Sequence, residues 1–251
     1  MANPNSQSPL LFHLICFTLY FGALLYDMLF LPTFGLRKIY GHRWKFLTIW
    51  CLLIQILYNF IAVLSAVTPI LTNRVKSLKD FLFASLAFPF GMDYSIQTPE
   101  ILAVTYVSQT VIRYSTLVSS MFWILYCLEP DFVYPLAERK IVPVALNHIW
   151  HTLVFISPML DVLLYEHKYP SRIYGHFCLA TFALLYIGCI FWIAHVAKVW
   201  IYGVLETMSA PMVVVFCLVL VLVTILLYEF GYWLERRKKR VLVVFTTCHQ
   251  Y

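Results

Sequence analysis

Long apolar runs recur along the whole chain, and each is about as long as a membrane-crossing helix, which needs about 20 predominantly apolar residues. Hydrophobic residues make up 62% of the 251 positions and charged residues 12%, whereas soluble domains have about 45–50% and about 25%. A soluble fold of this length could not hide so much apolar surface from water. The sequence therefore predicts an all-α fold, a multi-pass transmembrane helix bundle.

The runs divide the chain into about six crossings within one transmembrane domain, residues 1–235. We expect the first run to be a retained span, and we place the six at about 10–31, 44–71, 101–128, 141–165, 173–200 and 211–234. The last span is followed by a basic and atypical C-terminal tail, residues 236–251. An even number of crossings places both termini on one side of the membrane.

The third crossing has two possible registers. Residues 80–91 are apolar but too short to cross, and the polar stretch 93–100 follows them. A span at 101–128 would contain Arg113, whereas a chain without residues 92–116 would join 81–91 directly to 117–128. We interpret 92–116 as an insert and expect 92–100 to lie outside the hydrocarbon.

The basic residues cluster in short loops beside the apolar runs. With both termini inside, the inner segments carry ten Lys and Arg and the outer segments seven, a difference that comes from the run Arg236–Arg240. The positive-inside rule then places both termini in the cytosol. Basic clusters of this kind indicate membrane topology and contact with anionic lipid head groups, and we expect no nucleic-acid partner.

One apolar run contains a polar cluster, formed by Asn147, His148, His151 and Thr152. On a helix, Asn147 lies one turn from His151, and His148 one turn from Thr152. Polar groups cost several kcal/mol in hydrocarbon unless they are paired, so such a cluster indicates a functional site. The alternative is that these side chains only hydrogen-bond a neighbouring helix. His148 and His151 could also share a metal, but no second histidine cluster supports one, so we expect no metal and no cofactor.

A hydroxyl at Thr48 is a candidate partner for these imidazoles. The spans at 44–71 and 141–165 start on the same side of the membrane, with Thr48 about 6 Å and His151 about 14 Å below their helix heads. Boundaries read from sequence are uncertain by about 2–4 residues, so the two side chains can meet at one depth. A hydroxyl nucleophile beside an imidazole base is the minimal equipment for ester hydrolysis through an acyl-enzyme. Alternatively, Thr48 caps the helix or packs at an interface.

Several short motifs occur together and in a fixed order. They are Trp44-Lys45-Phe46-Leu47-Thr48, Leu86-Ala87-Phe88-Pro89, Val133-Tyr134-Pro135, Leu146-Asn147-His148-Ile149-Trp150-His151-Thr152, Tyr169-Pro170-Ser171 and Trp200-Ile201-Tyr202. In this combination, over about residues 10–235, the chain resembles the androgen-induced gene 1 protein family.

The resemblance implies a multi-pass threonine hydrolase that cleaves fatty acid esters of hydroxy fatty acids, lipids that would enter from the bilayer. The family nucleophile falls on Thr48 and the family base on His151, while Asn147 and His148 match the motif and are assigned supporting roles. Nothing in the sequence selects Asp27 or Asp161 to orient an imidazole. A non-enzymatic membrane scaffold or regulator, with a purely structural polar cluster, is the alternative function, and the sequence does not specify an oligomeric state.

The chain departs from the family pattern in three places. The segment near Met92–Thr116 interrupts a third span that is continuous in the family. The family's Trp-Val-Tyr-Pro is replaced by Trp200-Ile201-Tyr202-Gly203, and the tail after Arg240 is unlike the usual polar tail. We expect that removal of 92–116 would restore one uninterrupted span.

Overall fold

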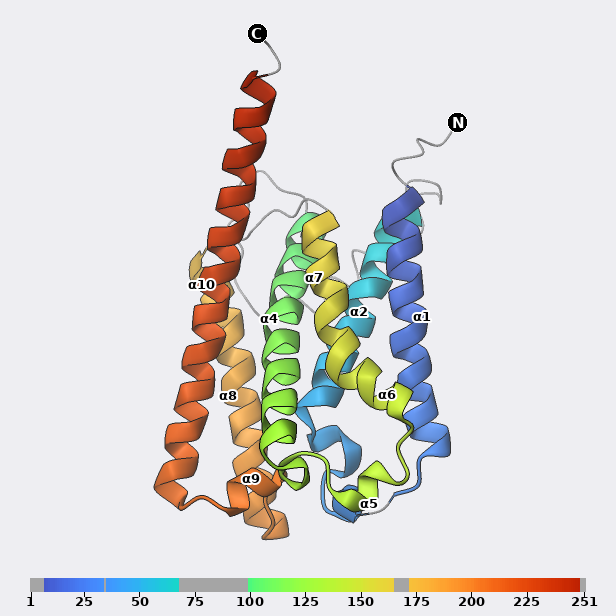
Figure 1. The fold of residues 1–251 in the computed structure, drawn as a ribbon, viewed down its shortest axis with the longest axis vertical. Coiled ribbons are helices and arrows are strands. Elements are labelled where there is room, and N and C mark those ends of the chain that lie inside the picture. The colour runs from blue at the N-terminus through green and yellow to red at the C-terminus, as the bar shows by residue number, and fades with distance from the viewer. Residues whose placement is uncertain (1–6, 34, 68–98, 165–171, 249–251) are drawn as a thin grey trace.

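The computed structural model describes residues 7–33, 35–67, 99–164 and 172–248, and every regular element in these ranges is a helix. The long helices lie side by side, and the start of the first and the end of the last are at the same end of the bundle (Figure 1). This arrangement confirms the predicted all-α bundle. The five longest are α1 (Gln7–Phe30), α2 (Leu47–Val67), α4 (Pro99–Leu128), α8 (Arg172–Ala197) and α10 (Ala210–Cys248).

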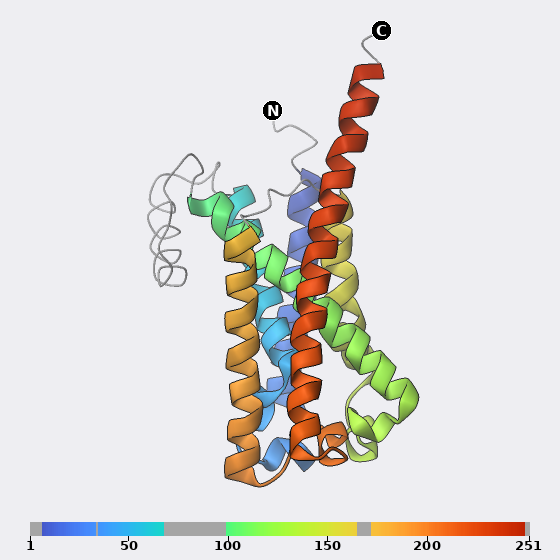
Figure 2. The same cartoon turned by 90° about the vertical axis from the view of Figure 1, so that its left-hand side faces the viewer.

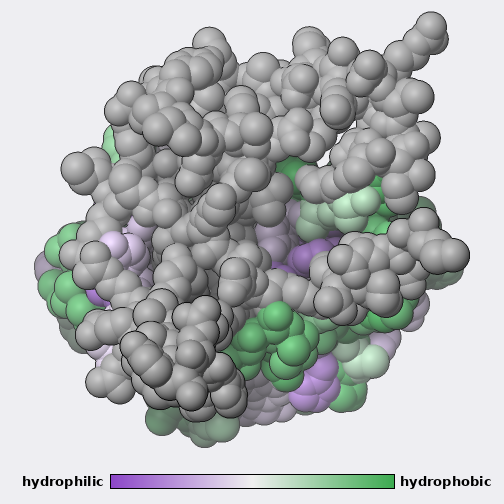
Figure 3. All heavy atoms as spheres, turned by 90° about the horizontal axis from the view of Figure 1, so that it is seen from above, coloured by the Kyte–Doolittle hydropathy of each residue, from purple (hydrophilic) through white to green (hydrophobic). Residues whose placement is uncertain are grey.

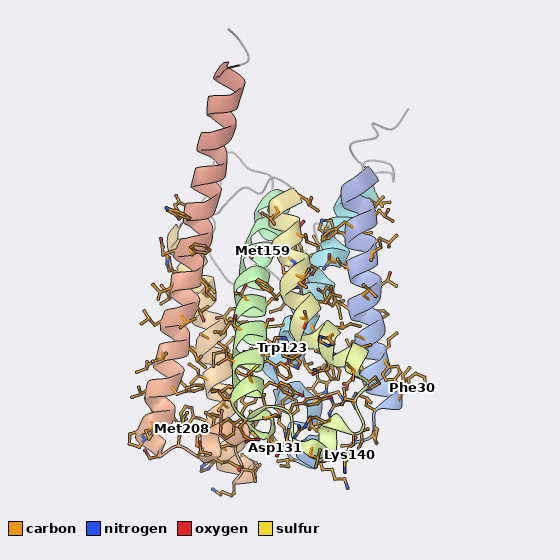
Figure 4. The ribbon with its side chains drawn as sticks, in the orientation of Figure 1. Phe30, Trp123, Asp131, Lys140, Met159 and Met208 are labelled. Carbon is orange, nitrogen blue, oxygen red and sulfur yellow. The ribbon has the colours of Figure 1, made fainter. Side chains whose placement is uncertain are left out.

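The short elements gather at the opposite end, which we name the loop end and define as residues 35–46, 129–143 and 198–209. Asp131, Lys140 and Met208 all lie there (Figure 4). This end holds both the start of α2 and the end of α4. Its elements are η2 (Gly35–Lys38), η3 (His42–Lys45), η4 (Pro130–Phe132), α5 (Leu136–Arg139) and α9 (Gly203–Glu206).

Among the described residues, four helical stretches are long and apolar enough to cross a membrane: Leu10–Phe30, Leu47–Leu64, Leu179–Ala197 and Ala210–Phe230. Within α4 a shorter apolar segment runs from Tyr114 to Leu128. Large apolar side chains also cover the outside of the bundle; Leu128, for example, is 71% exposed. Seen from the end that carries the termini, apolar residues form much of the visible rim (Figure 3). An apolar exterior of this kind suits lipid rather than water, so the chain is an integral membrane protein.

Helix α4 is central to the bundle, because it contacts α2, α7, α8 and α10. It crosses the bundle at an angle to α8 and α10 (Figure 2). It also adopts the register at 101–128 that contains Arg113, one of the two considered above. Residues 92–98 lie outside the described part of the chain, so the insert at 92–116 stays a prediction.

The last helix is longer than the sequence indicated. We expected the span to end against the basic run Arg236–Arg240, but α10 continues through it to Cys248. The run ends the apolar stretch, yet Arg and Lys are good helix formers and do not end the helix itself.

The crossing predicted at 141–165 is a composite of α6 (Val144–His148), the π-helix η5 (Ile149–Leu153) and α7 (Val154–Leu164). Pro143 is the N-cap residue at its start. Pro158 lies inside α7, and the departure from α-helical geometry comes earlier, at η5. Gln55 helps α7 to accommodate Pro158, since the Gln55 Nε2 donates to the Val154 carbonyl at 2.9 Å. That carbonyl lies four residues before Pro158, which has no N–H to offer.

Side chains from other helices also hold the π-helix. A π-helix displaces the usual backbone pairing, so its carbonyls need other donors. Tyr20 OH donates to the Leu153 carbonyl at 2.9 Å. Ser119 Oγ donates to the His151 carbonyl at 2.6 Å, and Trp123 Nε1 to the same oxygen at 3.3 Å. These bonds fix the backbone at the histidine that the sequence singled out.

Candidate active site

A cavity of about 180 Å³ lies near the loop end, among α2, α4, η5, α8 and α10. Thr48, Asn147 and His151 all line it, so residues from two distant motifs share one space. Most of the remaining wall is apolar and is formed by side chains such as Leu117, Val118, Phe122, Leu125, Ile190 and Leu220. A cavity with a few convergent polar groups in an apolar wall is typical of a ligand site.

Thr48 is the second residue of α2, and its side chain is partly buried. The first N–H groups of a helix have no intrahelical acceptor. Here the N–H of Leu47 donates to the hydroxyls of Tyr186, at 2.9 Å, and Tyr202, at 3.2 Å. Those hydroxyls lie 2.8 Å apart, and Tyr186 OH also donates to the Lys45 carbonyl at 3.1 Å. The tyrosine pair therefore fixes the start of the helix that carries Thr48.

His151 lies in η5 with its ring stacked on Phe122, at a centroid distance of 3.5 Å and an interplanar angle of 4°. Its Nδ1 is buried and makes no hydrogen bond with any described residue. Stacking on Phe122 and the two bonds to its carbonyl, rather than a carboxylate, hold the ring in place.

The two aspartates that could have oriented an imidazole are engaged elsewhere. Asp27 is fully buried and pairs with Arg37 and Arg43. Asp161 accepts a hydrogen bond from Tyr58, and its Oδ1 lies 3.6 Å from His13 Nε2.

The two supporting residues from the motif differ in position. Asn147 is buried and lines the cavity, and its Oδ1 makes no hydrogen bond within the described residues. His148 is exposed, and its Nδ1 lies 3.1 Å from Thr152 Oγ1, the pair that helical spacing predicted. Its ring stacks on Trp123 at 5.5 Å. Since His148 is not among the cavity-lining residues, it is poorly placed to assist Thr48.

The metal alternative required His148 and His151 to bind one metal ion together. Their side chains have different surroundings, one exposed and one on the cavity wall. In the part of the chain that the structure describes, no group of three or more His, Cys, Asp or Glu side chains is placed to hold a metal ion.

Charged residues form the loop-end boundary of the cavity, where Arg37 and Glu138 line its wall. Burial raises the pKa of Glu138, and Asp27 adds to that rise, while Arg37 and Lys45 oppose it. Burial lowers the pKa of Lys45, an effect that Glu138 opposes. Both shifts reflect the cost of charge away from water.

Several of these residues were not predicted from the sequence. Phe122, Tyr186 and Arg37 belong to none of the motifs, and no spacing rule relates them to Thr48 or His151. Tyr202 is different, because it lies in the Trp200-Ile201-Tyr202 motif and that signal was available.

The chain matches the family model described as FAR-17a/AIG1-like protein over residues 8–96 and 101–236. It is 30% identical over 182 residues to human androgen-induced gene 1 protein, covering 68% of this chain and 66% of that protein. It is 31% identical over 175 residues to human androgen-dependent TFPI-regulating protein, covering 67% and 65% of the two chains.

The matched regions thus span just under two thirds of the length of these two relatives. The mouse androgen-dependent TFPI-regulating protein is 28% identical over 196 residues, with 76% of this chain and 75% of that protein covered. No solved structure matches the chain. The family model covers most of the chain, and the resemblance first drawn from its motifs is confirmed: this protein belongs to the FAR-17a/AIG1-like family.

Proposed function

We propose that this protein is a membrane-embedded hydrolase that cleaves the ester bond of fatty acid esters of hydroxy fatty acids. The observation that carries the proposal is the convergence of Thr48 and His151 on one largely apolar cavity. Lipid can reach such a site directly from the bilayer. The buried Asn147 on the same wall supplies a polar group beside the reacting pair.

In the acylation step, the Thr48 hydroxyl attacks the ester carbonyl carbon while the His151 imidazole accepts its proton. The tetrahedral oxyanion takes a hydrogen bond from the side-chain amide of Asn147. Collapse breaks the bond to the alkoxide oxygen. The imidazolium returns its proton to that oxygen, and the hydroxy fatty acid leaves.

In the second step, water attacks the acyl-threonine and gives its proton to His151. The ester bond to Thr48 then breaks, the threonine oxygen regains a proton, and the second fatty acid is released. The sum is one ester and one water converted to one carboxylic acid and one hydroxy acid. Both steps need a neutral imidazole at the start, and an apolar wall favours that form because burial disfavours charge.

A fluorophosphonate probe tests the nucleophile directly, because it phosphonylates activated hydroxyls. The wild-type protein in membranes should be labelled, and Thr48→Ala should not. Thr152→Ala is the matched control, because the Thr152 hydroxyl belongs to the same polar motif as His151 but contacts His148 and does not line the cavity. Equal labelling of wild type and Thr48→Ala would exclude Thr48 as the nucleophile.

A second candidate function is a non-enzymatic scaffold or regulator, in keeping with the regulatory role in the name of one relative. The observation that favours it is the structural use of polar groups around η5, where Tyr20, Ser119 and Trp123 all bond its carbonyls. Under this alternative, Thr48→Ala and His151→Ala would change folding or partner binding and there would be no hydrolysis to lose.

A further inference from the structure

Several polar atoms of the cavity-lining side chains have no hydrogen bond within the described residues. A buried polar atom without a partner is uncommon in native proteins and needs an explanation. Two of them, Arg37 Nε and Trp150 Nε1, are obligate donors. The full set is Arg37 Nε, Glu138 Oε1, Asn147 Oδ1, Trp150 Nε1 and His151 Nδ1.

The two donors belong to side chains in contact. The Arg37 guanidinium carbon lies 5.6 Å from the centroid of the Trp150 ring. Arg37 is 5% and Trp150 6% exposed, and both line the cavity. Each side chain thus brings a buried, unsatisfied N–H to the same cavity, and such donors suit an anionic oxygen ligand.

Arg37 also belongs to a buried ion-pair cluster. Asp27 is fully buried and serves two cations, since Arg37 Nη1 binds one of its oxygens and Arg43 Nη1 the other at 2.8 Å. Both oxygens of Asp27 are thus already engaged by guanidinium groups, while Arg37 Nε has no hydrogen bond within the described residues.

The rest of the cavity wall is apolar, so the same space that offers a cationic end also suits a hydrocarbon chain. A ligand with one anionic group and a long apolar body fits both features. A fatty acid ester of a hydroxy fatty acid has this character, because the hydroxy acid keeps its own free carboxylate.

We propose that Arg37 and Trp150 form a carboxylate-binding subsite that holds the free carboxylate of the lipid whose ester bond is cleaved at Thr48. The subsite rests on the proposed hydrolysis for its substrate. It also makes the number of carbons between carboxylate and ester a determinant of specificity, because one group is held at Arg37 and the other at Thr48.

Glu138 affects how strongly this subsite binds a carboxylate. It lines the same cavity, and when ionised it opposes a second carboxylate there. Its raised pKa, caused chiefly by burial, favours the protonated form, which can donate a hydrogen bond instead. Replacement by Gln keeps a donor and removes the charge, so Glu138→Gln should bind the carboxylate at least as well as wild type.

The test compares a free-acid ester of this class with the same lipid as its methyl ester, so that only the carboxylate differs. Wild type should prefer the free acid in kcat/KM by about 10- to 100-fold, the range expected for charge-assisted hydrogen bonds. In Arg37→Gln the preference should fall towards one. In Trp150→Phe, which keeps an aromatic ring but loses the pyrrole part of the indole with its N–H, it should fall several-fold.

Arg43→Gln is the matched control, because it removes another guanidinium from Asp27 and does not line the cavity. It should keep the wild-type preference. Equal cleavage of acid and methyl ester by wild type, or an undiminished preference in Arg37→Gln, would overturn the subsite. If Arg37→Gln fails to fold, the wild-type ratio and Trp150→Phe decide.

A binding measurement separates this inference from hydrolysis. Purified wild type is loaded with a fluorescent fatty acid, which is then displaced with palmitate or with palmitamide. Palmitate should displace at least tenfold better, and Arg37→Gln should lose that difference. Carboxylate-selective binding without hydrolysis would support the subsite and contradict the proposed hydrolase activity. Hydrolysis without carboxylate selectivity would support the activity and contradict the subsite.

Discussion

Two buried regions of the bundle contain similar polar side chains but differ in how these side chains are hydrogen-bonded. The cavity, near the loop end, holds Thr48 and His151 and several polar atoms that no described residue satisfies. Nearer the termini, α1, α2 and α7 share a second region whose polar groups bond one another. His13 Nδ1 lies 3.0 Å from Asn59 Oδ1, and Tyr58 donates to Asp161.

That second region, which we name the termini network, also contains Gln55, whose Nε2 donates to Ser115 Oγ at 3.1 Å. Asn59 Nδ2 donates in turn to the Gln55 carbonyl at 2.8 Å. Polar residues inside a membrane bundle are therefore not all alike. The side chains of the termini network bond one another and join helices, whereas several side chains on the cavity wall keep polar atoms that no described residue satisfies.

The largest expected effect is on catalysis in the cavity. Thr48→Ala and His151→Ala should each lower kcat by about 10⁴-fold or more, and the double mutant should be no worse, because nucleophile and base act as a unit. Thr48→Ser should keep part of the activity, since it loses only the methyl that restricts χ1. Ester hydrolysis by purified protein measures each rate.

His148→Ala is the matched control for the base, because it removes an exposed imidazole of the same motif that does not line the cavity. Its activity should stay near wild type. An inactive His148→Ala beside an active His151→Ala would reverse the assignment of the two histidines and break the comparison between cavity and surroundings.

The termini network should respond in the opposite way, through stability. Gln55→Leu removes the donor to the Val154 carbonyl, which Pro158 leaves without a backbone partner. Interhelical hydrogen bonds in membranes contribute about 1–2 kcal/mol at most, so the Tm should fall by roughly 2–8 °C at about 2–4 °C per kcal/mol. Activity per folded molecule should not change.

Thr18→Val is the control for this loss, because the Thr18 hydroxyl bonds only the Leu14 carbonyl of its own helix, on the outer face. It should leave the Tm nearly unchanged. If Gln55→Leu instead lowered kcat with no change in Tm, the network would have a catalytic role and the contrast between the two regions would be wrong.

The sequence predicted the helix bundle because the length of an apolar run can be read directly along the chain, without knowing how the helices pack. Counting crossings also placed the starts of the helices that carry Thr48 and His151 on the same side of the membrane, so that the two side chains could meet. The sequence could not predict Arg37 or Phe122 on the cavity wall, because their positions depend on how η2 and α4 pack in three dimensions. The π-helix at Ile149–Leu153 was missed for a related reason: its stability comes from Tyr20, Ser119 and Trp123, on other helices.

An intermediate effect should come from the tyrosine pair, which belongs to the cavity but acts through the backbone. Tyr186→Phe removes one of two hydroxyls that accept from the Leu47 N–H, along with the bond to the Lys45 carbonyl. A hydrogen bond contributes about 1 kcal/mol, so kcat should fall roughly five- to tenfold as the start of α2 loosens.

Tyr26→Phe, on the exposed face of α1, is the control and should show no change. The position of the label from the fluorophosphonate probe gives a second readout: Tyr186→Phe should still be labelled at Thr48, only more slowly. Full loss of labelling with a folded protein would mean that the Tyr186 hydroxyl takes part in the reaction itself.

The smallest effect expected is a pH dependence of stability at Glu138. Its folded-state pKa is raised above the unfolded value of about 4.3, so the protonated form contributes stability that is present below that value. This contribution is lost as pH rises through the folded-state pKa. Glu138→Gln carries no titrating group, so the Tm of wild type should fall relative to the variant as pH rises from about 4, then level off.

Titration of Lys45, in the same cluster, does not interfere with this measurement. Its lowered pKa contributes stability above the unfolded value of about 10.4, which is lost as pH falls through the folded-state pKa, so its window lies on the alkaline side. Glu206→Gln, at an exposed carboxylate of the loop end, controls for general charge effects. A Tm difference between wild type and Glu138→Gln that did not vary with pH would mean that Glu138 is not held away from water. The end of the cavity at Arg37 would then be less enclosed than the carboxylate subsite requires.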